Sequence, residues 1–278
     1  MRESNIILTG LPRSGTTLTC HLLNKLPDTV ALHEPMTVSQ FPKLRDPSAI
    51  CGEIDRFFDS TRKSLLKNRT ALSKHAQGKV PDNPFPDKYS PSGLRLGRAA
   101  AVSKIAIDKD LSEDFLLIIK HPAAFTALLP VLVERFRCFA VIRNPVSVLS
   151  SWNSIAVPVE NGHAPAAENL DPGLKSSLSL LDDKFDRQLF LLSWFFDRYR
   201  TFLPGDRIIR YENTIASRGA NLTVITEKAA ALREPLENKN KNKIYHRDMM
   251  QRIGEKLLAS EGAYWDFYDK SQVEKLLD

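Results

Sequence analysis

The sequence predicts an α/β fold, a three-layer sandwich in which helices cover both faces of a mainly parallel central sheet. Short apolar runs rich in β-branched residues recur along the chain, and helical patterns separate several of them, an alternation typical of parallel sheets. A glycine-flanked turn follows the first run and reopens as a helix, as in loops that bind phosphate. With 278 residues, 42% of them hydrophobic, we expect residues 1–278 to form one domain.

The strands and helices follow from the spacing of apolar residues. Strands are expected at residues 6–9, 30–32, 116–120, 138–142 and 207–211. Helices are expected at 16–26, 123–136, 146–152 and 182–202, the last with Phe190, Trp194 and Phe195 in the core. Residues 45–100, with the proline-rich stretch VPDNPFPDKYSP, interrupt the alternation. We expect this insertion to form a lid that binds the acceptor, and residues 161–174 to form a second loop with the same role.

Charge and cysteine content restrict the class of protein. The formal net charge is +6, but the basic residues are dispersed and no nucleic-acid-binding motif is present, which favours a small anionic ligand over nucleic acid. Cys20, Cys51 and Cys138 lie far apart and predict neither a disulfide nor a metal site. No signal-like segment opens the chain and no apolar run approaches the ~20 residues of a membrane span, so we expect a cytoplasmic location. The oligomeric state cannot be inferred.

The turn after the first strand has the composition of a phosphate-binding loop. Its sequence, GLPRSGTT, combines two glycines, three hydroxyl side chains and one arginine, and has threonine where ATP- and GTP-binding loops have lysine. Ser14 or Thr16 could instead cap the following helix, although capping alone does not require the glycines and the arginine. The candidate phosphate-binding residues are Pro12, Arg13, Ser14, Gly15, Thr16 and Thr17.

A second anion site is predicted where the fourth strand ends. Arg143 follows the strand at 138–142, and Ser151 lies eight residues later, two turns into a helix. This spacing brings a guanidinium and a hydroxyl toward one anion. Taken alone the pattern is weak, because Arg-Asn-Pro after a strand is common in turns.

Together the two motifs resemble the 5′-phosphosulfate loop and the 3′-phosphate site of the sulfotransferases. The segments LLIIKHP (116–122) and RYEN (210–213) match that family in the same order, so the resemblance extends from residue 5 to about 215. It implies the sulfotransferase fold, which is similar to that of P-loop-containing nucleoside triphosphate hydrolases. It also implies 3′-phosphoadenosine 5′-phosphosulfate as cofactor, adenosine 3′,5′-bisphosphate as product and no metal. Tyr211 is either a cofactor contact or part of a strand end in which Glu212 pairs with a cation.

The resemblance also indicates the catalytic groups. Lys120 would lie beside the sulfonate, and Glu34, in the segment LHEP, matches the catalytic glutamate of many carbohydrate and protein-tyrosine sulfotransferases. His121 is the competing base, because aryl and steroid sulfotransferases place a histidine after the lysine, but with one residue between them. We favour Glu34, then His121 and last His33; a structural role for either histidine stays open.

The expected reaction is an in-line displacement. Glu34 deprotonates the acceptor hydroxyl, while Lys120, Arg13 and the loop N–H groups stabilise the growing negative charge. The favoured acceptor is a glycan or another small-molecule alcohol. The run NKNKNK (238–243) is either a solvated loop or a flap over the 3′-phosphate.

Two alternative functions remain. A P-loop kinase acting on a small molecule would require lysine at position 16 and an acidic strand end for magnesium, whereas the late strands end in Lys120, Arg143 and Arg210. A non-catalytic module that binds nucleotide or nucleic acid could also retain the fold.

Overall fold

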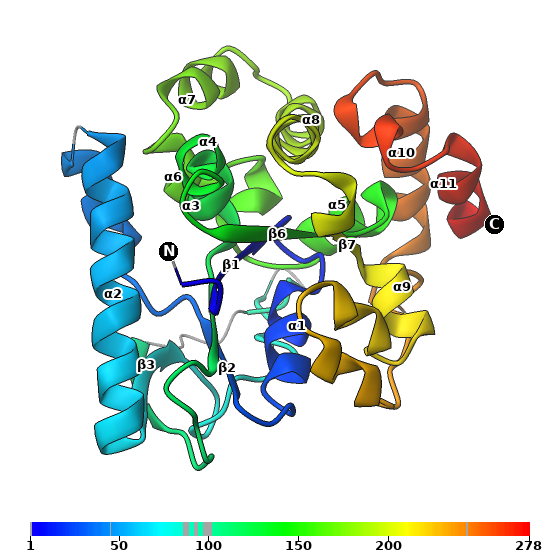
Figure 1. Ribbon diagram of the computed structural model, residues 1–278. Coiled ribbons are helices and arrows are strands. Elements are labelled where there is room, and N and C mark those ends of the chain that lie inside the picture. Colours follow the sequence, from blue (N-terminus) through cyan, green and yellow to red (C-terminus); the bar gives the residue numbers. More distant parts are fainter. Residues whose placement is uncertain (1, 45, 86–88, 92–93, 97–101, 243) are drawn as a thin grey trace.

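The computed structural model describes residues 2–278 except 45, 86–88, 92–93, 97–101 and 243. Within the described residues, five parallel strands form a central sheet in the order β2-β5-β1-β6-β7. Helices cover both faces of this sheet (Figure 1), so the predicted α/β three-layer class is confirmed. The strands are β1 (Asn5–Gly10), β2 (Thr29–His33), β5 (Leu116–Lys120), β6 (Arg137–Ile142) and β7 (Ile208–Arg210).

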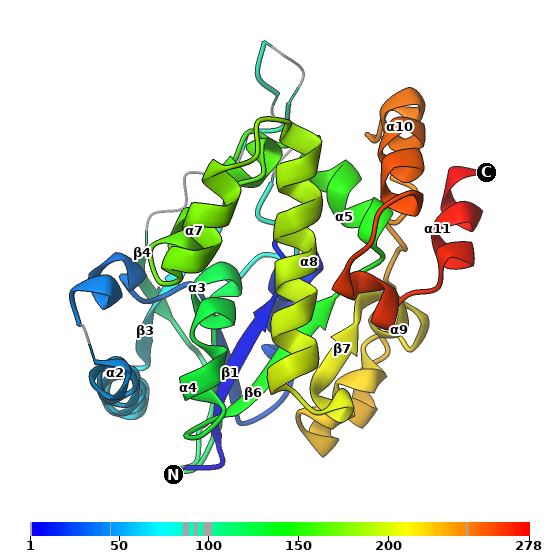
Figure 2. The same cartoon turned by 90° about the horizontal axis from the view of Figure 1, so that it is seen from above.

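The helices form two layers and a group beside the sheet. α3 (Pro122–Ala127), α4 (Leu129–Leu132) and α8 (Lys184–Phe202) lie over one face, and α1 (Thr16–Leu23) lies over the other. Figure 2 shows α10 and α11 together on the β7 side of the sheet. The remaining helices are α2 (Pro47–Asn68), α5 (Pro145–Trp152), α6 (Pro165–Glu168), α7 (Pro172–Ser179), α9 (Tyr211–Ala216), α10 (Arg247–Leu258) and α11 (Lys270–Leu277).

The core explains why the central strands are apolar at nearly every position. Successive side chains of a strand point to opposite faces, and here both faces are covered. Ile7 of β1 packs into the larger apolar cluster with residues of α3 and α8, whereas Ile6 and Leu8 pack into a second cluster with Leu22 of α1. Ile6, Ile7 and Leu8 are all fully buried.

Several predicted boundaries differ from the structure. Arg207 and Tyr211 belong to the helical turns on either side of β7, and α1 ends at Leu23. The helix expected at 123–136 is divided into α3 and α4, because Pro130 has no N–H to donate to the preceding turn. The helix expected at 182–202 begins at Lys184, where the Asp183 side chain caps its N-terminus.

One predicted core residue is wrong. Phe190 is 39% exposed, while Phe195 is buried and Trp194 is partly buried against the core. The buried side of α8 includes Leu192 and Tyr199, and at about 100° per residue Phe190 lies roughly opposite both. Cys20, Cys51 and Cys138 are all buried and free.

The segment at 45–100 contains a long helix and a strand beside its proline-rich stretch, and of these the sequence did not predict the strand. It begins with the 22-residue helix α2, whose Ile54 and Phe58 are fully buried. β3 (Thr70–Lys74) follows and pairs antiparallel with β4 (Val102–Ala106). Both strands have few buried apolar residues, so their sequences TALSK and VSKIA show little of the alternation that reveals a strand.

Gly10 is required where β1 passes into the turn at 10–17. Its φ is 144°, and a Cβ atom there would lie 2.4 Å from the Val141 carbonyl oxygen and 2.7 Å from Cγ2 of Thr16. Close approach of β1, β6 and the start of α1 therefore depends on the missing side chain.

We predict that Gly10→Ala lowers the free energy of unfolding by about 3 kcal/mol or more, from crowding and from an unfavourable backbone conformation. Gly78→Ala is the control: its φ is 79°, but nothing lies within 4 Å of the added Cβ. That change should cost about 1 kcal/mol, for the backbone alone. Urea denaturation measures both; equal losses would contradict the prediction.

Candidate active site

The carboxyl ends of the five parallel strands meet at one edge of the sheet. Figure 2 shows β1, β6 and β7 running toward this edge. Each strand brings a candidate residue or segment to this edge. In the spatial order of the strands these are Glu34 after β2, Lys120 at the end of β5, the turn at 10–17 after β1, Arg143 after β6 and Tyr211 after β7. Ligands of open α/β sheets bind at such an edge.

A cavity of about 930 Å³ opens at this edge. The predicted site residues among its lining are Pro12, Arg13, Gly15, Thr16, Thr17, His33, Glu34, Lys120, Arg143 and Tyr211. Three other predicted residues, Ser14, Ser151 and His121, are buried beside it and make the contacts described below. Candidates from five separate segments are thus brought to one cavity.

The loop at 10–17 is held by backbone and hydroxyl contacts. The Ser14 hydroxyl contacts the carbonyl oxygens of Leu11 at 2.8 Å and Val141 at 2.7 Å, so this side chain faces the protein. Gly15, with φ of 98°, precedes α1, and neither Ser14 nor Thr16 caps that helix through its side chain. The ring of Tyr211 covers Gly15, where a Cβ would lie 2.8 Å from Cδ2 of the tyrosine.

Arg13 reaches from this loop toward the second predicted anion site. Its Nε donates to Oγ of Ser151 at 3.2 Å, and its guanidinium lies 4.3 Å from the centroid of the Phe85 ring. Burial, together with the nearby Arg143, lowers the pKa of Arg13 to about 10, against the opposite effect of Tyr245. Arg13 and Ser151, predicted for different phosphates, are therefore in direct contact.

Arg143 is covered by the segment predicted as a flap. Its Nε donates to Oδ1 of Asn240 at 2.7 Å, and its two Nη atoms donate to the carbonyl oxygens of Lys239 and Arg13. The guanidinium also lies 4.6 Å from the centroid of the Tyr211 ring. Residues 238–242 therefore lie against the predicted 3′-phosphate site; Lys243, the last residue of this run, lies outside the described residues.

The RYEN segment divides between the cavity and the neighbouring structure. Tyr211 lines the cavity, and its hydroxyl accepts from the N–H of Lys239 at 3.0 Å. Glu212 accepts from the Asn144 N–H, the Asn240 amide and the Tyr268 hydroxyl, at 2.8–2.9 Å. Arg210 donates to the Phe267 carbonyl oxygen and lies over the Tyr268 ring, so it binds the C-terminal segment and does not line the cavity.

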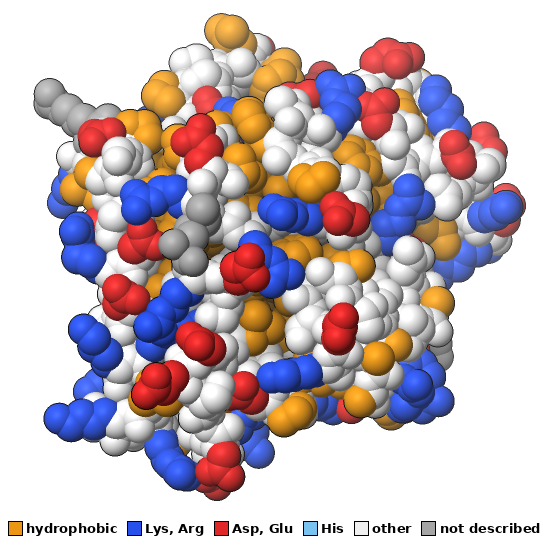
Figure 3. Space-filling model, viewed as in Figure 1, with side chains coloured by type: hydrophobic (Ala, Val, Ile, Leu, Met, Phe, Trp, Pro, Cys, Tyr) orange, Lys and Arg blue, Asp and Glu red, His pale blue; other side chains and the backbone are white. Residues whose placement is uncertain are grey.

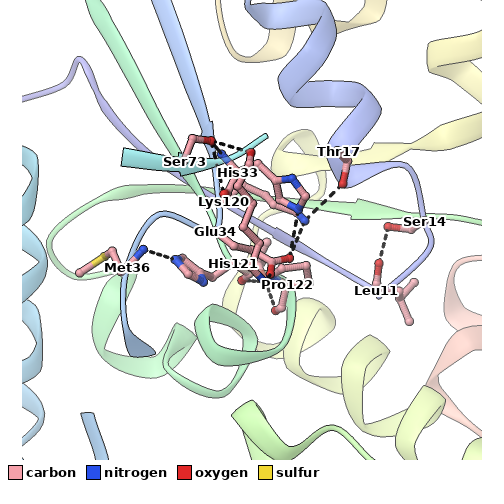
Figure 4. A network of polar contacts seen from close by, with 12 residues as sticks. Leu11, Ser14, Thr17, His33, Glu34, Met36, Ser73, Lys120, His121 and Pro122 are labelled. Atoms are coloured by element: carbon pink, nitrogen blue, oxygen red, sulfur yellow. Dashed lines mark hydrogen bonds and ion pairs between the residues drawn. The ribbon is translucent and has the colours of Figure 1, made fainter. Parts of the chain in front are cut away.

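Glu34 and Lys120 form an ion pair at the other side of the cavity (Figure 4). Lys120 Nζ lies 2.9 Å from Oε1 of Glu34 and donates to Oγ1 of Thr17 at 3.4 Å. Burial opposes ionisation of Glu34, but Lys120, then His33 and Lys74, outweigh it and hold the pKa of Glu34 well below 4.5. At neutral pH Glu34 is an ionised carboxylate.

The two candidate histidines differ in their orientation. His121 Nε2 accepts from the Met36 N–H at 3.2 Å, and Figure 4 shows the ring directed toward Met36, away from the Glu34–Lys120 pair. Nε2 of His33 instead lies 3.4 Å from Oε1 of Glu34. Burial lowers the pKa of His33 to about 4 and that of His121 to about 3, with Lys120 adding to both shifts. Both imidazoles are neutral at pH 7.

Several cavity residues were not found from the sequence. Lys74 at the end of β3 binds Oε2 of Glu34 at 2.6 Å, but no strand was predicted there. Of the described residues in the expected lid, those that line the cavity are Lys74, Asp82, Asn83, Pro84, Phe85 and Arg95, while α2 packs elsewhere. The second expected loop contributes His163–Ala166. The alternating prolines near Phe85 were visible in the sequence, but the contact with Arg13 depends on tertiary folding.

Among the described residues there is no group of three or more His, Cys, Asp or Glu side chains arranged to hold a metal ion. No helix in the described parts of the chain has both the length and the apolar character needed to span a membrane. On the face shown in Figure 3, basic and acidic side chains are interspersed.

Comparison with known proteins gives limited information. No protein-family model matches the chain, and no curated protein matches it. A solved structure that resembles it is the sulfotransferase STF9 from Mycobacterium avium, with a TM-score of 0.39 and 14% identity over 97% of this chain and 78% of that one. At that level the likeness carries no argument, so the site is interpreted from its own geometry.

The neutral histidines predict a loss of stability in acid. In the unfolded chain a histidine binds a proton below about pH 6.5, whereas His33 and His121 stay neutral in the folded protein until about pH 4 and 3. Stability is therefore fully present above pH 6.5 and falls as the pH drops; between pH 8 and pH 5 each histidine should cost about 2 kcal/mol. His121→Gln, which retains a hydrogen-bond acceptor, should remove its share from the pH dependence of urea unfolding. His246→Gln, at an exposed position, is the control; a slope unchanged in His121→Gln would contradict the prediction.

Proposed function

We propose that this chain is a sulfotransferase that uses 3′-phosphoadenosine 5′-phosphosulfate and sulfates a hydroxyl group of an acceptor. The observation that supports this proposal is the placement of two arginines at the ends of adjacent strands. Arg13 follows β1 and Arg143 follows β6, and both border the same cavity. A nucleotide that carries separate 5′ and 3′ phosphate groups matches two neighbouring cationic sites.

The described residues fit this cofactor. Arg13, Thr16, Thr17 and the N–H groups of the loop would hold the 5′-phosphosulfate, since the turn opens directly into α1. Arg143 and Ser151 would hold the 3′-phosphate, because both lie beside Arg13. The Tyr211 ring, which covers Gly15, would border the nucleoside.

The residues on the β2 and β5 side would perform the transfer. Glu34 takes the proton of the acceptor hydroxyl on a carboxylate oxygen, and the acceptor oxygen forms a bond to sulfur. The cofactor supplies the sulfuryl group, and the bond from sulfur to its 5′-phosphate oxygen breaks with the electron pair leaving on that oxygen. Lys120 and Arg13 stabilise the negative charge on the sulfonate and on the leaving phosphate. The proton on Glu34 then passes to solvent.

The site favours this reaction over phosphoryl transfer from a nucleoside triphosphate. Position 16 is threonine, so the loop lacks the lysine that contacts the β- and γ-phosphates in P-loop kinases. Glu34, the acidic residue after β2, is paired with Lys120 and Lys74. β5 and β7 end at Lys120 and Arg210, and Arg143 follows β6, so none of these strand ends supplies the carboxylate with which a P-loop kinase holds magnesium. A non-catalytic nucleotide-binding module remains the outcome if binding occurs without transfer.

An apolar part of the cavity wall favours a small-molecule alcohol as acceptor. Ala123 at the start of α3 lines the cavity, as do Ile155, Val157 and Val159 between α5 and α6. These side chains are apolar and lack the charged groups that a polyanionic chain would need for binding. An alcohol with an apolar body, or a single sugar that presents its less polar face, suits this wall.

The proposal is tested first by binding of adenosine 3′,5′-bisphosphate. We predict that Arg143→Ala weakens this ligand by about 10- to 100-fold, because a charge-assisted hydrogen bond contributes about 1.5–3 kcal/mol. Binding of 5′-AMP, which has no 3′-phosphate, should change by less than about threefold, within the roughly 0.5 kcal/mol of a neutral change. Isothermal titration calorimetry measures both affinities.

Matched controls separate the 3′-phosphate contact from a general loss of structure. Ser151→Ala removes one hydroxyl and should also weaken the bisphosphate more than 5′-AMP. Arg210→Ala removes a strand-end arginine that serves the C-terminal segment, and should leave the ratio of the two affinities unchanged. Equal weakening of both ligands by Arg143→Ala would refute the 3′-phosphate site, and a wild-type protein that binds neither ligand would refute the function.

The catalytic base is tested by comparing Glu34 with His121. Glu34→Gln keeps the shape of the side chain and removes its basicity, so we predict a fall in kcat of ~10²-fold or more. Affinity for adenosine 3′,5′-bisphosphate should not fall, because Lys120 loses a competing carboxylate. His121→Gln should retain most of the turnover. A mild effect of Glu34→Gln together with a severe effect of His121→Gln would reverse the assignment.

A further inference from the structure

Lys74 holds the carboxylate oxygen of Glu34 that Lys120 does not hold. Its Nζ lies 2.6 Å from Oε2 of Glu34, whereas Nζ of Lys120 lies 2.9 Å from Oε1. The two lysines come from different sheets, because Lys74 is the last residue of β3 and Lys120 the last residue of β5. Each oxygen of one carboxylate thus has its own ammonium partner. Lys74 also lines the cavity.

The position of Lys74 is fixed by the neighbouring strand end. The N–H of His33, the residue before Glu34, donates to Oγ of Ser73 at 3.0 Å, and Ser73 is fully buried. The β3–β4 pair is therefore attached to the end of β2 at the residue next to the carboxylate. An ordinary surface ion pair lacks such an anchor, and its two flexible side chains contribute little.

Glu34 itself has an unusual backbone. Its φ is 47°, in the left-handed region that a glutamate rarely adopts. The conformation is maintained because the Glu34 N–H donates to the carbonyl oxygen of Lys120 at 2.8 Å. This turn directs the side chain to a place where ammonium groups approach from two sides, and a carboxylate held from two sides keeps one partner if the other leaves.

We propose that Lys74 is a positioning residue that keeps the Glu34 carboxylate in place and ionised when Lys120 turns toward the sulfonate of the donor. This inference rests on the proposed function, in which Lys120 has to serve both groups. Lys74 retains Oε2, and Oε1 becomes free to take the proton of the acceptor hydroxyl. The β3–β4 pair, which the sequence did not reveal, thereby becomes part of the acceptor side of the site.

The titratable groups around Glu34 allow a clean test. Lys120, His33 and Lys74 contact its carboxylate, and His121, just after β5, and Cys20 in α1 lie near enough to influence it. The pKa of His33 is lowered to about 4 and that of His121 to about 3, and burial raises the pKa of Cys20 to about 12. Among the described residues, the ammonium groups in contact with the carboxylate are those of Lys74 and Lys120.

The experiment is a double-mutant cycle read by ¹³C NMR of the Glu34 side-chain carboxyl, assigned by its loss in Glu34→Gln. If Lys74 replaces Lys120, Lys120→Met alone leaves the carboxyl titrating below about pH 4.5, its ordinary value. The double variant Lys74→Met/Lys120→Met should titrate at least about one pH unit higher, as expected when a buried carboxyl loses an opposite charge.

Lys74→Arg combined with Lys120→Met should restore the low value. Lys104→Met, an exposed lysine on the same strand pair, combined with Lys120→Met is the matched control and should change nothing.

Equal titration of Lys120→Met and the double variant would overturn the inference, since Lys74 would then hold nothing. Because the measurement needs no turnover, it remains informative if the chain fails to bind adenosine 3′,5′-bisphosphate, a result that would refute the proposed function alone. In an active enzyme, the acid limb of kcat/KM for the acceptor, measured at saturating donor so that the donor-bound enzyme is the free form, should move to higher pH by about one unit in Lys74→Met. An unmoved limb in an enzyme that binds the bisphosphate would refute the inference and leave the function standing.

Discussion

The register of the parallel sheet is the constraint on which the site depends. His33 pairs with Lys120 across β2 and β5, so the next residue after His33 meets the end of β5. The Glu34 N–H continues this ladder by donating to Lys120, and the carboxylate therefore lies beside the lysine of the neighbouring strand. Gly10 pairs with Val141 in the same way and brings the turn at 10–17 against the residues that follow β6. A shift of one residue would turn these side chains to the other face.

The cations gathered at this edge are compensated by the protein itself. Lys120 is almost fully buried and would be costly without a partner, and Glu34 supplies one. Arg143 is satisfied by the Asn240 side chain and by backbone carbonyl oxygens, and Arg13 by Ser151 and the ring of Phe85. The site is thus preorganised by contacts from segments distant in sequence, including the loop at 238–242 and the part of the insertion near Phe85.

The sequence predicted those parts of the site that local pattern determines. The five strands of the sheet are apolar because both faces are buried, and their ends identified Lys120, Arg143 and the loop at 10–17. The β3–β4 pair was missed because a two-stranded sheet on the surface buries few side chains, so TALSK carries no clear pattern. Lys74 was missed with it. Arg210 contacts the C-terminal segment and His121 contacts Met36, and both contacts are made with residues distant in sequence. The position of Arg210 and His121 at strand ends could not show that they contact the protein and do not bind a ligand.

The same contacts indicate which anions the cavity can bind under the proposed function. An anion at Arg13 or Arg143 has to replace neutral acceptors: a serine hydroxyl, an amide oxygen and carbonyl oxygens. A phosphate group forms hydrogen bonds roughly twice as strong as these, so the exchange is favourable at both arginines. At Lys120 the present partner is already a carboxylate, and a sulfonate with a single charge gains no such advantage. Lys120 can therefore turn from Glu34 to the sulfonate only if the carboxylate keeps another cation, and the second ammonium beside Glu34, that of Lys74, supplies it.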